Sequence, residues 1–388
     1  MKKLVRKAIY TREDEEALVA KGTEWNFHDE GTQEHLHTLH PYPAKFIPQI
    51  PRRAISLWTE PNDLVYDPFN GCGTTVLEAS LAGRRGIGTD NNAVAVLAAR
   101  AKTAIYSEDD LQALYTFAAK VAGGLDFAAP RPDLIPTNKN FHYWFDAATV
   151  SRLAALKGLI FAEVEPVRSL LMAVFSAIIV RVSYQDSDTR YSRKLRHVRA
   201  DEVDVAFRSR LDDVISRIPQ SMIEGRGEVH VVQADARNVP FITTGSVSLI
   251  VTSPPYLNAY DYHKYHRQRL HWIGGDESVS FARDLEIGSH DEFTKKNATP
   301  DGYFEDMNAC FAEWYRVLKK GGRCLVVIGD AIVSKQAVYV GDRFVDLLSS
   351  NGFKQDGRWI RTLHSTKRAF NVKNSRISHE HVLLVRKY

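Results

Sequence analysis

Residues 64–75 read LVYDPFNGCGTT, a short apolar run that is followed by an acid, a proline and two glycines. The next residues, Val76–Ala82, have the composition of a helix. A strand, a glycine-containing turn and a helix in this order form the nucleotide-binding corner of a doubly wound α/β sheet, where the glycines let the backbone approach a ligand closely. We therefore expect an α/β fold with a cofactor site in the turn between Asp67 and Thr75.

A second acid supports a nucleotide ligand. Residues Arg85–Asp90 read as another strand, and Asp90 stands 17 residues beyond Gly73. A carboxylate at this place can accept hydrogen bonds from both hydroxyls of a ribose, and an N-cap of the next helix is the structural alternative. The turn lacks the longer dinucleotide fingerprint, and the chain has no triphosphate-binding glycine loop. The turn alone therefore leaves the identity of the nucleotide open.

The other informative stretch is Thr252–Tyr256, which reads TSPPY and follows the apolar run Val247–Val251. Its two prolines fix φ and remove backbone donors, so the turn is stiff and its carbonyls remain free to accept. A stiff turn with acceptors and an aromatic ring can hold a planar amino group. Methylation of an exocyclic base amine requires such a grip, because the base must leave its stack and enter a pocket.

The two stretches together resemble the S-adenosylmethionine-dependent amino-methyltransferases of DNA, which modify N4 of cytosine or N6 of adenine. The resemblance covers residues 35–102 and 228–388. Within these ranges, His40–Phe46 is similar to a segment that closes over the methionine end of the cofactor in this family. Gln233–Ala236 matches the place where an acid meets the adenine amino group of the cofactor. It implies a Rossmann-like methyltransferase sheet and S-adenosyl-L-methionine as the cofactor. The implied cofactor-binding residues are Lys45, Phe46, Asp67, Phe69, Gly71, Gly73, Thr74, Asp90 and Asp235.

The same resemblance implies catalysis by Ser253, Pro254, Pro255 and Tyr256. Hydrogen bonds from the amine to the Ser253 hydroxyl and the Pro254 carbonyl would favour a pyramidal nitrogen that can attack, and Tyr256 would stack on the flipped base. Positioning supplies much of the rate of such a transfer. None of the three cysteines, Cys72, Cys310 and Cys324, lies on this loop, so carbon-5 methylation of cytosine is not expected.

Serine at position 253 favours cytosine N4, because family members with aspartate there lean towards adenine N6. DNA with a flipped target base is the implied partner, and a restriction-modification role would add a cognate restriction endonuclease. Three alternatives stay open: an adenine N6 enzyme, an RNA base-amine methyltransferase, and an inactive nucleic-acid-binding module.

Bulk charge does not identify the partner, because the 388 residues carry a net charge of only +4. Two local runs, Arg190–Arg199 and Tyr260–Arg267, interleave cations with aromatic residues, as contacts to phosphates and bases require. Solvated helix faces are the alternative. The predicted nucleic-acid contacts are Tyr260, Lys264, Arg267, Arg190, Arg193, Lys194 and Arg196.

The histidines and the apolar runs predict neither a metal site nor a membrane span. His35, His37 and His40, and likewise His263, His266 and His271, cluster without the carboxylate–histidine spacing of metal ligands. The longest apolar run, Ser169–Val180, is too short to cross a bilayer, and the charged start of the chain does not resemble a secretory leader. We therefore expect a cytoplasmic protein without a metal ion.

The spacing of apolar residues divides the chain into three parts. Residues 1–63 form an arm and a lid segment over the cofactor, and residues 64–106 and 228–388 form the catalytic domain. Residues 107–227 have helical spacing throughout, which predicts a helical insertion and a possible target-recognition region. In the last part we expect a long polar and aromatic segment over residues 257–300, then a helix over Tyr303–Lys319 that ends at Gly321 and Gly322. A strand over Arg323–Asp330, a helix near Gly341–Ser350 and final strands over Phe353–Thr362 and His381–Arg386 should follow.

Overall fold

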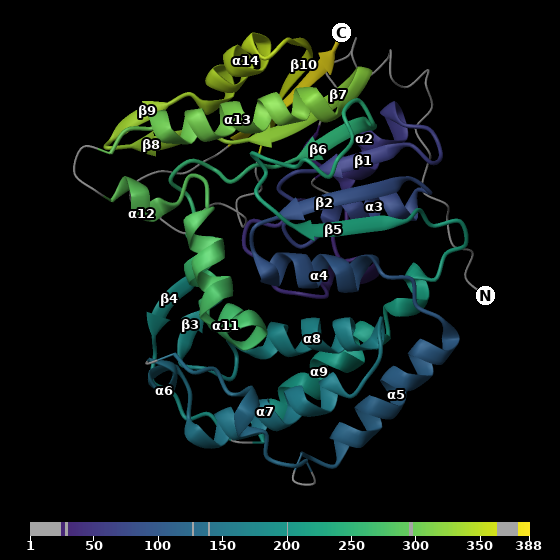
Figure 1. Ribbon diagram of the computed structural model, residues 1–388, viewed down its shortest axis with the longest axis vertical. Coiled ribbons are helices and arrows are strands. Elements are labelled where there is room, and N and C mark those ends of the chain that lie inside the picture. The colour runs from purple at the N-terminus through teal and green to yellow at the C-terminus, as the bar shows by residue number, and fades with distance from the viewer. Residues whose placement is uncertain are drawn as a thin grey trace.

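The computed structural model describes residues 25–27, 30–125, 128–138, 140–199, 201–294, 298–362 and 379–388. Among these residues, seven strands form one sheet in the order β10-β11-β7-β6-β1-β2-β5 (Figure 1). The five strands from β7 to β5 pair in parallel, and β11 is antiparallel to both of its neighbours. The strands are β1 (Leu64–Asp67), β2 (Arg85–Asp90), β5 (Val229–Gln233), β6 (Val247–Thr252), β7 (Leu318–Ile328), β10 (Phe353–Thr362) and β11 (His379–Lys387). This topology confirms the expected α/β fold and both final strands. Most of the predicted arm lies outside the described residues.

The order of the strands reverses beside β1. The chain runs from β1 through β2 to β5 on one side, and returns to β6 and β7 on the other side. Val65 pairs with Leu249 and Tyr66 pairs with Ile250, so β1 and β6 are direct parallel neighbours. In a doubly wound sheet, ligands bind beyond the carboxyl ends of the strands at such a switch point. The glycine-containing turn after β1 and the TSPPY turn after β6 therefore start side by side.

Both faces of the central strands are covered. Ile250 packs in the core beneath α13 and α14, whereas Leu249 and Val251 pack in the core beneath α2. Burial on both faces explains why β6 is an apolar run without polar alternation. The helices near the sheet are α2 (Gln49–Trp58), α3 (Thr74–Leu81), α4 (Ala93–Thr103), α13 (Asp301–Val317) and α14 (Val340–Ser350); the hairpin strands β8 (Ala331–Val333) and β9 (Gln336–Val338) follow β7.

A second layer of helices lies below α4 in Figure 1 and has a core of its own. It contains α5 (Glu108–Ala122), α6 (Phe141–Trp144), α7 (Ala147–Phe161), α8 (Val167–Ile178) and α9 (Glu202–Ile215), with short 3₁₀ turns η1 (His35–Thr38), η2 (Pro132–Leu134) and η3 (Ile218–Ser221). The apolar run 169–180 lies largely in α8 and is buried there. No helix in the described ranges has both the length and the apolar character needed to span a bilayer.

The expectation of helical structure throughout residues 107–227 was wrong at one place. Residues Gln185–Ser187 (β3) and Arg190–Arg193 (β4) form an antiparallel hairpin. Tyr191 turns inward onto the ring of Trp144, while Arg190 and Ser192 on either side are exposed. Of the basic run Arg190–Arg199, only Arg190–Arg193 form a strand, and the residues after it have no regular structure. The run is therefore not a helix face.

The polar and aromatic segment of residues 257–300 is largely helical. This stretch contains α10 (Tyr262–Tyr265), α11 (Arg267–Asp284) and α12 (His290–Phe293). Helix α11 bends at Gly274 and Gly275, whose backbone angles are not helical. Its Trp272 lies in the core of the helical layer, and its Leu270 packs on α4. The two glycines and the many charged residues hid the helical period in the sequence.

The predicted glycine cap of α13 was wrong as well. Helix α13 ends at Val317, and β7 already begins at Leu318. Gly321, with φ of +77°, lies inside β7. There the register between β6 and β7 shifts, so the glycine forms part of a β-bulge and does not cap a helix.

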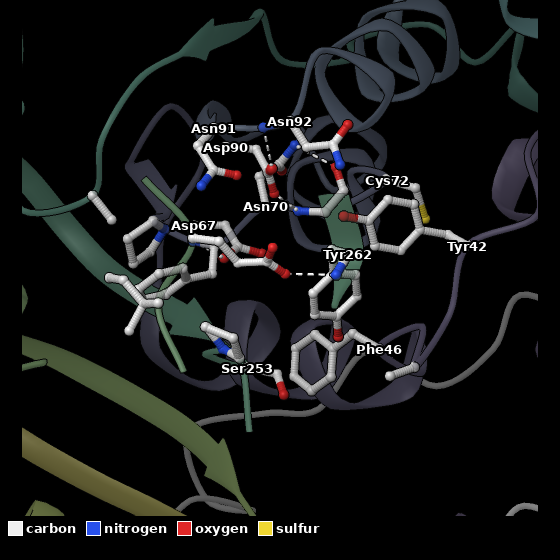
Figure 2. A pocket seen from close by; sticks show the side chains of 18 of the residues that line it. Tyr42, Phe46, Asp67, Asn70, Cys72, Asp90, Asn91, Asn92, Ser253 and Tyr262 are labelled. Atoms are coloured by element: carbon white, nitrogen blue, oxygen red, sulfur yellow. Dashed lines mark hydrogen bonds between the residues drawn. The ribbon is translucent and has the colours of Figure 1, made fainter. Parts of the chain in front are cut away.

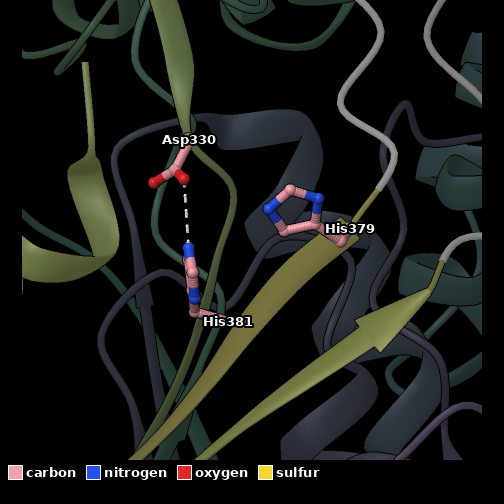
Figure 3. Close-up of side chains that lie close together, drawn as sticks. All are labelled: Asp330, His379 and His381. Carbon is pink, nitrogen blue, oxygen red and sulfur yellow. Dashed lines mark hydrogen bonds and ion pairs between the residues drawn. The ribbon is translucent and has the colours of Figure 1, made fainter. Parts of the chain in front are cut away.

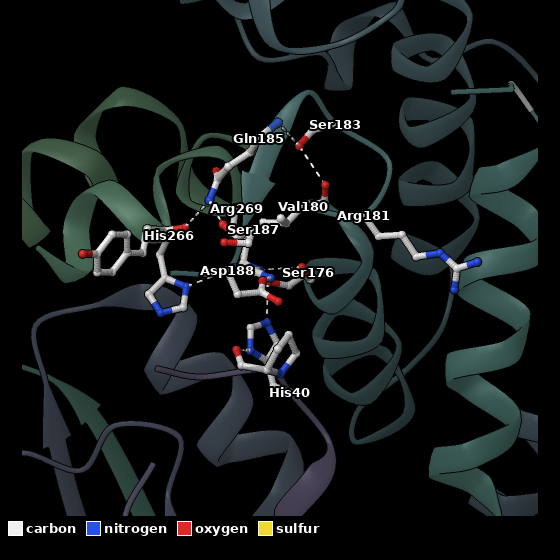
Figure 4. Close-up of polar contacts among 12 residues, drawn as sticks. His40, Ser176, Val180, Arg181, Ser183, Gln185, Ser187, Asp188, His266 and Arg269 are labelled. Atoms are coloured by element: carbon white, nitrogen blue, oxygen red, sulfur yellow. Dashed lines mark hydrogen bonds and ion pairs between the residues drawn. The ribbon is translucent and has the colours of Figure 1, made fainter. Parts of the chain in front are cut away.

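A buried polar junction ties the lid segment to the helical layer (Figure 4). The Arg269 side chain is fully buried; its Nε donates to the carbonyl of Ser176 at 3.0 Å and its Nη2 pairs with Asp188 in the β3–β4 turn. His40, from the lid segment, contacts Ser176 Oγ through its Nε2 at 3.0 Å. The lid, α8, α11 and the hairpin therefore share one network.

Substitution Asp188→Ala should destabilise the protein strongly, because it leaves the buried Arg269 guanidinium without a carboxylate. We expect the free energy of unfolding, measured by urea denaturation, to fall by roughly 2 kcal/mol, less than for a fully buried pair because the Asp188 side chain is 41% exposed. Asp186→Ala is the matched control, since Asp186 pairs with the exposed Arg190 at 3.1 Å, and exposed pairs contribute about 1 kcal/mol or less. Equal losses in the two variants would contradict this account of the junction.

Candidate active site

A pocket opens where the parallel strands end (Figure 2). Its wall contains residues that follow β1, β2, β5 and β6, together with lid residues and the segments on either side of α11. Asp90 lies at one end of the pocket, Ser253 at the other, and Asp67 between them. The described wall residues are Tyr42, Ala44, Lys45, Phe46, Asp67, Pro68, Phe69, Asn70, Gly71, Cys72, Thr74, Asp90, Asn91, Asn92, Ala234, Asp235, Ala236, Ser253, Pro255, Tyr262, Leu285, Glu286 and Ile287.

Two hydrogen bonds join the loop after β1 to the end of β6. Thr252 Oγ1 donates to Asp67 Oδ1 at 2.7 Å, and Thr75 Oγ1 donates to the carbonyl of Val251 at 3.2 Å. The Asp67 side chain is almost fully buried, and this burial raises its pKa to about 6. The structure therefore brings together two loops that are 185 residues apart in the sequence.

Asp90 is placed by the backbone. Its carboxylate accepts from the N–H of Gly71 at 2.8 Å and from the N–H of Asn92 at 2.9 Å. The N-cap of α4 is Asn92, whose side chain accepts from Val94, so Asp90 is not the cap that was its structural alternative. Burial raises the pKa of Asp90 to about 7 in spite of these hydrogen bonds.

The two glycines of the loop have different roles. Gly71 lines the pocket with φ of +48°. Gly73 is not among the wall residues; it has φ of +82°, and a Cβ there would lie 2.7 Å from the Cβ of Ala99 in α4. The missing side chain of Gly73 therefore makes room for α4, and its contact with the cofactor stays a prediction.

Two predicted cofactor residues already have partners in the protein. The Asp235 carboxylate accepts two hydrogen bonds from Arg237, from Nε to Oδ1 at 2.9 Å and from Nη2 to Oδ2 at 2.8 Å. Lys45 Nζ donates to the carbonyls of His37 at 2.9 Å and His40 at 3.3 Å, which holds the lid segment together. Both residues still line the pocket, as do Phe46, Phe69 and Thr74.

The loop after β6 presents acceptors. Ser253 Oγ donates to the carbonyl of Val327 at 3.1 Å, so its lone pairs can accept from a ligand. Pro255 also lines the pocket, and its carbonyl accepts from the Tyr303 hydroxyl at 3.0 Å. Pro254 is buried and is not among the wall residues.

Tyr256 is anchored from the far end of the chain. Its hydroxyl donates to Glu380 Oε1 on β11 at 2.6 Å, and Glu380 Oε2 pairs with Arg361 on β10 at 2.6 Å. Glu380 and Arg361 are both buried, so the tyrosine ring is held by a hydrogen-bonded ion pair. Like Pro254, Tyr256 is not among the wall residues.

Sequence reasoning missed several wall residues, among them Tyr42, Tyr262 and Glu286. The ring of Tyr42 stacks on Tyr262 at 5.9 Å and on His266 at 4.9 Å between centroids. Glu286 accepts from the N–H of Tyr262 at 2.5 Å. Tyr42 stands inside the quoted lid segment and could have been chosen from it, but Glu286 follows the unpredicted α11 and belongs to no motif.

The pocket wall is acidic. Asp67, Asp90, Asp235 and Glu286 contribute four carboxyl groups, whereas Lys45 is the only lysine or arginine among the described wall residues. Backbone N–H groups and polar side chains surround these acids. Such a wall favours a ligand with positive charge and with hydroxyl or amino donors.

The predicted nucleic-acid contacts fall into two groups. Arg190, Arg193, Lys194 and Arg267 have exposed side chains. Three others are engaged within the protein: Arg196 donates to the carbonyls of Val180, Arg181 and Ser183 beyond the end of α8, Lys264 pairs with Asp261 and Asp291, and the Tyr260 ring packs on Tyr262.

A further histidine group, which sequence analysis did not single out, lies beside the end of β7 (Figure 3). Asp330, His379 and His381 could each offer a metal ligand. His381 Nε2 lies 3.2 Å from Asp330 Oδ2, and Arg358 Nη2 lies 3.2 Å from His381 Nδ1. Both ring nitrogens of His381 thus have protein partners, and these contacts satisfy the imidazole without an ion.

Comparison with known proteins agrees with this geometry. A family model described as DNA methylase matches residues 2–100 and 247–388, more than half of the chain. The type II methyltransferase M.MvaI of Kocuria varians is 22% identical over 283 residues, which are 64% of this chain and 59% of that protein. M.MjaII of Methanocaldococcus jannaschii is 36% identical over 80 residues, 21% of this chain and 14% of that protein.

The chain thus spans less than two thirds of the length of either relative. Among solved structures, a SAM-dependent methyltransferase from Methanosarcina mazei is 10% identical with a TM-score of 0.33, over 85% of this chain and 94% of that one. Because the family model matches more than half of the chain, the chain belongs to the DNA methylase family of N6- and N4-directed amino-methyltransferases, whose methyl donor is S-adenosyl-L-methionine.

Proposed function

We propose that this protein is a DNA methyltransferase that transfers a methyl group to an exocyclic amino group of a flipped base, with N4 of cytosine preferred to N6 of adenine. The observation that carries the proposal is the hydrogen bond between Thr252 and Asp67 at 2.7 Å. It fastens the base-gripping loop to the cofactor loop, so that Ser253 and Phe69 line one pocket. The preference for cytosine rests on serine at position 253.

The residues of the pocket fit S-adenosyl-L-methionine. This molecule has a sulfonium and an ammonium group, a ribose and an adenine amino group, and the wall offers acidic and backbone partners for such groups. Asp90, already held by two backbone N–H groups, would accept from the ribose hydroxyls. The residues Lys45, Phe46, Asp67, Phe69, Gly71 and Thr74 would surround the methionine end, and Asp235 the adenine end. When bound, the cofactor supplies an activated methyl group on sulfur.

The chain's own task is to orient the amine. Because the Ser253 hydroxyl proton points to Val327, its oxygen accepts one N–H of the target amine, and the Pro254 carbonyl would accept the other. These acceptors draw the nitrogen lone pair out of conjugation with the ring and direct it towards the pocket. Positioning of this kind supplies a large part of the rate enhancement. Tyr256 would provide the stacking face for the base, and its anchor on Glu380 fixes that face.

The function is tested by the bases that the protein modifies. DNA from cells that express the chain would be sequenced with detection of N4-methylcytosine and N6-methyladenine. We expect N4-methylcytosine in one sequence context. N6-methyladenine alone would replace the cytosine assignment, and the absence of both from DNA, with modified RNA instead, would overturn the proposal.

Substitution Ser253→Ala should reduce methyl transfer by roughly 100-fold, the effect of removing one hydrogen bond made to the reacting group. The affinity for S-adenosyl-L-methionine should not change, because Asp90 and the loop after β1 remain intact. Transfer of labelled methyl to DNA and calorimetric titration of the cofactor measure the two quantities. Ser246→Ala is the control, since Ser246 is half-buried outside the pocket and its hydroxyl bonds only to the carbonyl of Thr243 among described residues. A parallel loss of cofactor affinity in Ser253→Ala would contradict this division of roles.

Substitution Tyr256→Phe should lower kcat by about tenfold, because the ring stays but loses the hydroxyl that positions it. Cofactor affinity should stay near that of the parent protein, while thermal stability should fall modestly, because the buried Glu380 Oε1 loses its donor. Tyr115→Phe, at an exposed tyrosine of α5, is the control. A Tyr256→Phe enzyme with full activity would show that Glu380 does not position the ring.

Cofactor affinity should depend on pH through Asp90. The carboxylate form accepts hydroxyl donors and attracts a cation, and the protonated form does neither as well. Since burial raises the pKa of Asp90 to about 7, affinity should be full above that pH and fall as the pH drops below it. Asp90→Asn should bind the cofactor weakly and with little pH dependence near neutrality. Asp63→Asn, outside the pocket, should keep the parental profile in calorimetric titrations; a flat parental profile would contradict the role of Asp90.

A further inference from the structure

A second cavity, of about 570 Å³, lies in the bend of α11 and outside the active pocket. Arg267, Gln268 and His271 from the first arm of α11 line it, and Asp276 and Arg283 from the second arm face them. Residues next to and within α6, and Tyr191 on β4, complete the wall. The segments on either side of α11 line the active pocket, because Tyr262 precedes the helix and Glu286 follows it.

One wall of this second cavity is aromatic. The rings of Trp144 and Tyr191 lie 4.7 Å apart at an interplanar angle of 32°, and Tyr143 meets Trp144 edge-on at 5.4 Å. The guanidinium of Arg193 lies 4.2 Å from the centre of the Tyr143 ring. Tyr143 is 52% exposed, so this aromatic surface is accessible. Aromatic rings combined with guanidinium groups form stacking platforms for nucleobases.

The wall also contains polar atoms that lack partners. Gln268 is 1% exposed, and its Oε1 has no hydrogen-bond partner among the described residues. The same holds for Nδ2 of Asn138. An unpaired buried polar atom costs about 1–3 kcal/mol, which a ligand with a matching donor and acceptor would recover. Glutamine and asparagine amides match the hydrogen-bonding edges of nucleobases.

The charge around this second cavity suits a polyanion. Arg267 and Arg283 are exposed at the wall, as are Arg190 and Arg193 on the adjoining β4 and Lys194 just beyond it. Arg190 and Lys194 share one acid, Asp186, and Arg283 pairs with Asp284. The acid in the wall, Asp276, lies 3.0 Å from His271. Along the left edge of Figure 1, α12, α11, β4 and α6 follow one another, and the arrows of β2 and β5 point to the same edge. A DNA strand that reaches the active pocket therefore meets these cations.

We propose that this second cavity binds a second nucleobase of the DNA substrate, unstacked from the duplex and read by Gln268 and Asn138 against the Tyr143 and Tyr191 rings. This inference rests on the proposed function, since it requires DNA at the active pocket. It assigns target reading to the bend of α11 together with the aromatic wall, where two segments distant in sequence meet.

The test uses DNA duplexes that carry 2-aminopurine at one position at a time around the methylated base. Fluorescence of 2-aminopurine rises when the base leaves the stack. With the parent protein we expect a rise at the target and at one further position. Tyr143→Ala and Asn138→Ala should abolish the second rise and keep the first. They should also reduce discrimination against a changed base at the second position by about tenfold in kcat/KM, as expected when one specific base contact is lost.

Tyr115→Ala, at an exposed tyrosine on α5 outside this second cavity, is the matched control and should keep both rises. Calorimetric titration of S-adenosyl-L-methionine should give the parental affinity for all three variants, which shows that they are folded. A parent protein that methylates DNA but gives only one rise, or folded cavity variants with parental discrimination, would overturn this inference alone. A parent protein that methylates no DNA would overturn the proposed function, and the inference with it.

Discussion

The parallel pairing of β1 with β6 is the constraint on which the site depends. It places the carboxyl ends of two strands side by side although a large part of the chain separates them, and the bond from Thr252 to Asp67 fastens the loops that follow. Closing so long a loop is entropically unfavourable. Burial of β6 on both faces, in the cores beneath α2 and beneath α13, offsets that cost. The fully buried strand β6 therefore carries part of the geometry of the active pocket.

The burial of carboxyl groups in the pocket costs electrostatic free energy. Asp67 and Asp90 are buried carboxyl groups whose pKa values rise because burial disfavours the charged form. Hydrogen bonds from Thr252, Gly71 and Asn92 lower that cost only in part. A cationic ligand with hydroxyl donors would stabilise the charged forms. The pocket would therefore gain binding free energy from a cationic ligand and none from an anionic ligand.

Helix α11 joins the two halves of the molecule. Its Trp272 belongs to the core of the helical layer, while its Leu270 packs on α4 of the sheet layer. The rings of Tyr42 and His266 connect the lid to the same segment, and Arg269 extends the connection to Asp188 in the β3–β4 turn. Helix α11 therefore links the helical layer to the active pocket, since Tyr262 precedes the helix, Glu286 follows it and both line the pocket.

Residue order alone was enough for the strand–turn–helix corner, the TSPPY turn, the acid at the end of β2 and the final strands, because each depends on local periodicity and on the backbone limits of proline and glycine. Packing between distant segments decided the rest. Gly73 makes room for α4, Tyr256 is anchored by Glu380, Arg196 binds backbone carbonyls, and Glu286 enters the pocket. No local pattern encodes these contacts, since each requires a partner that only the folded sheet and the bent α11 bring within reach.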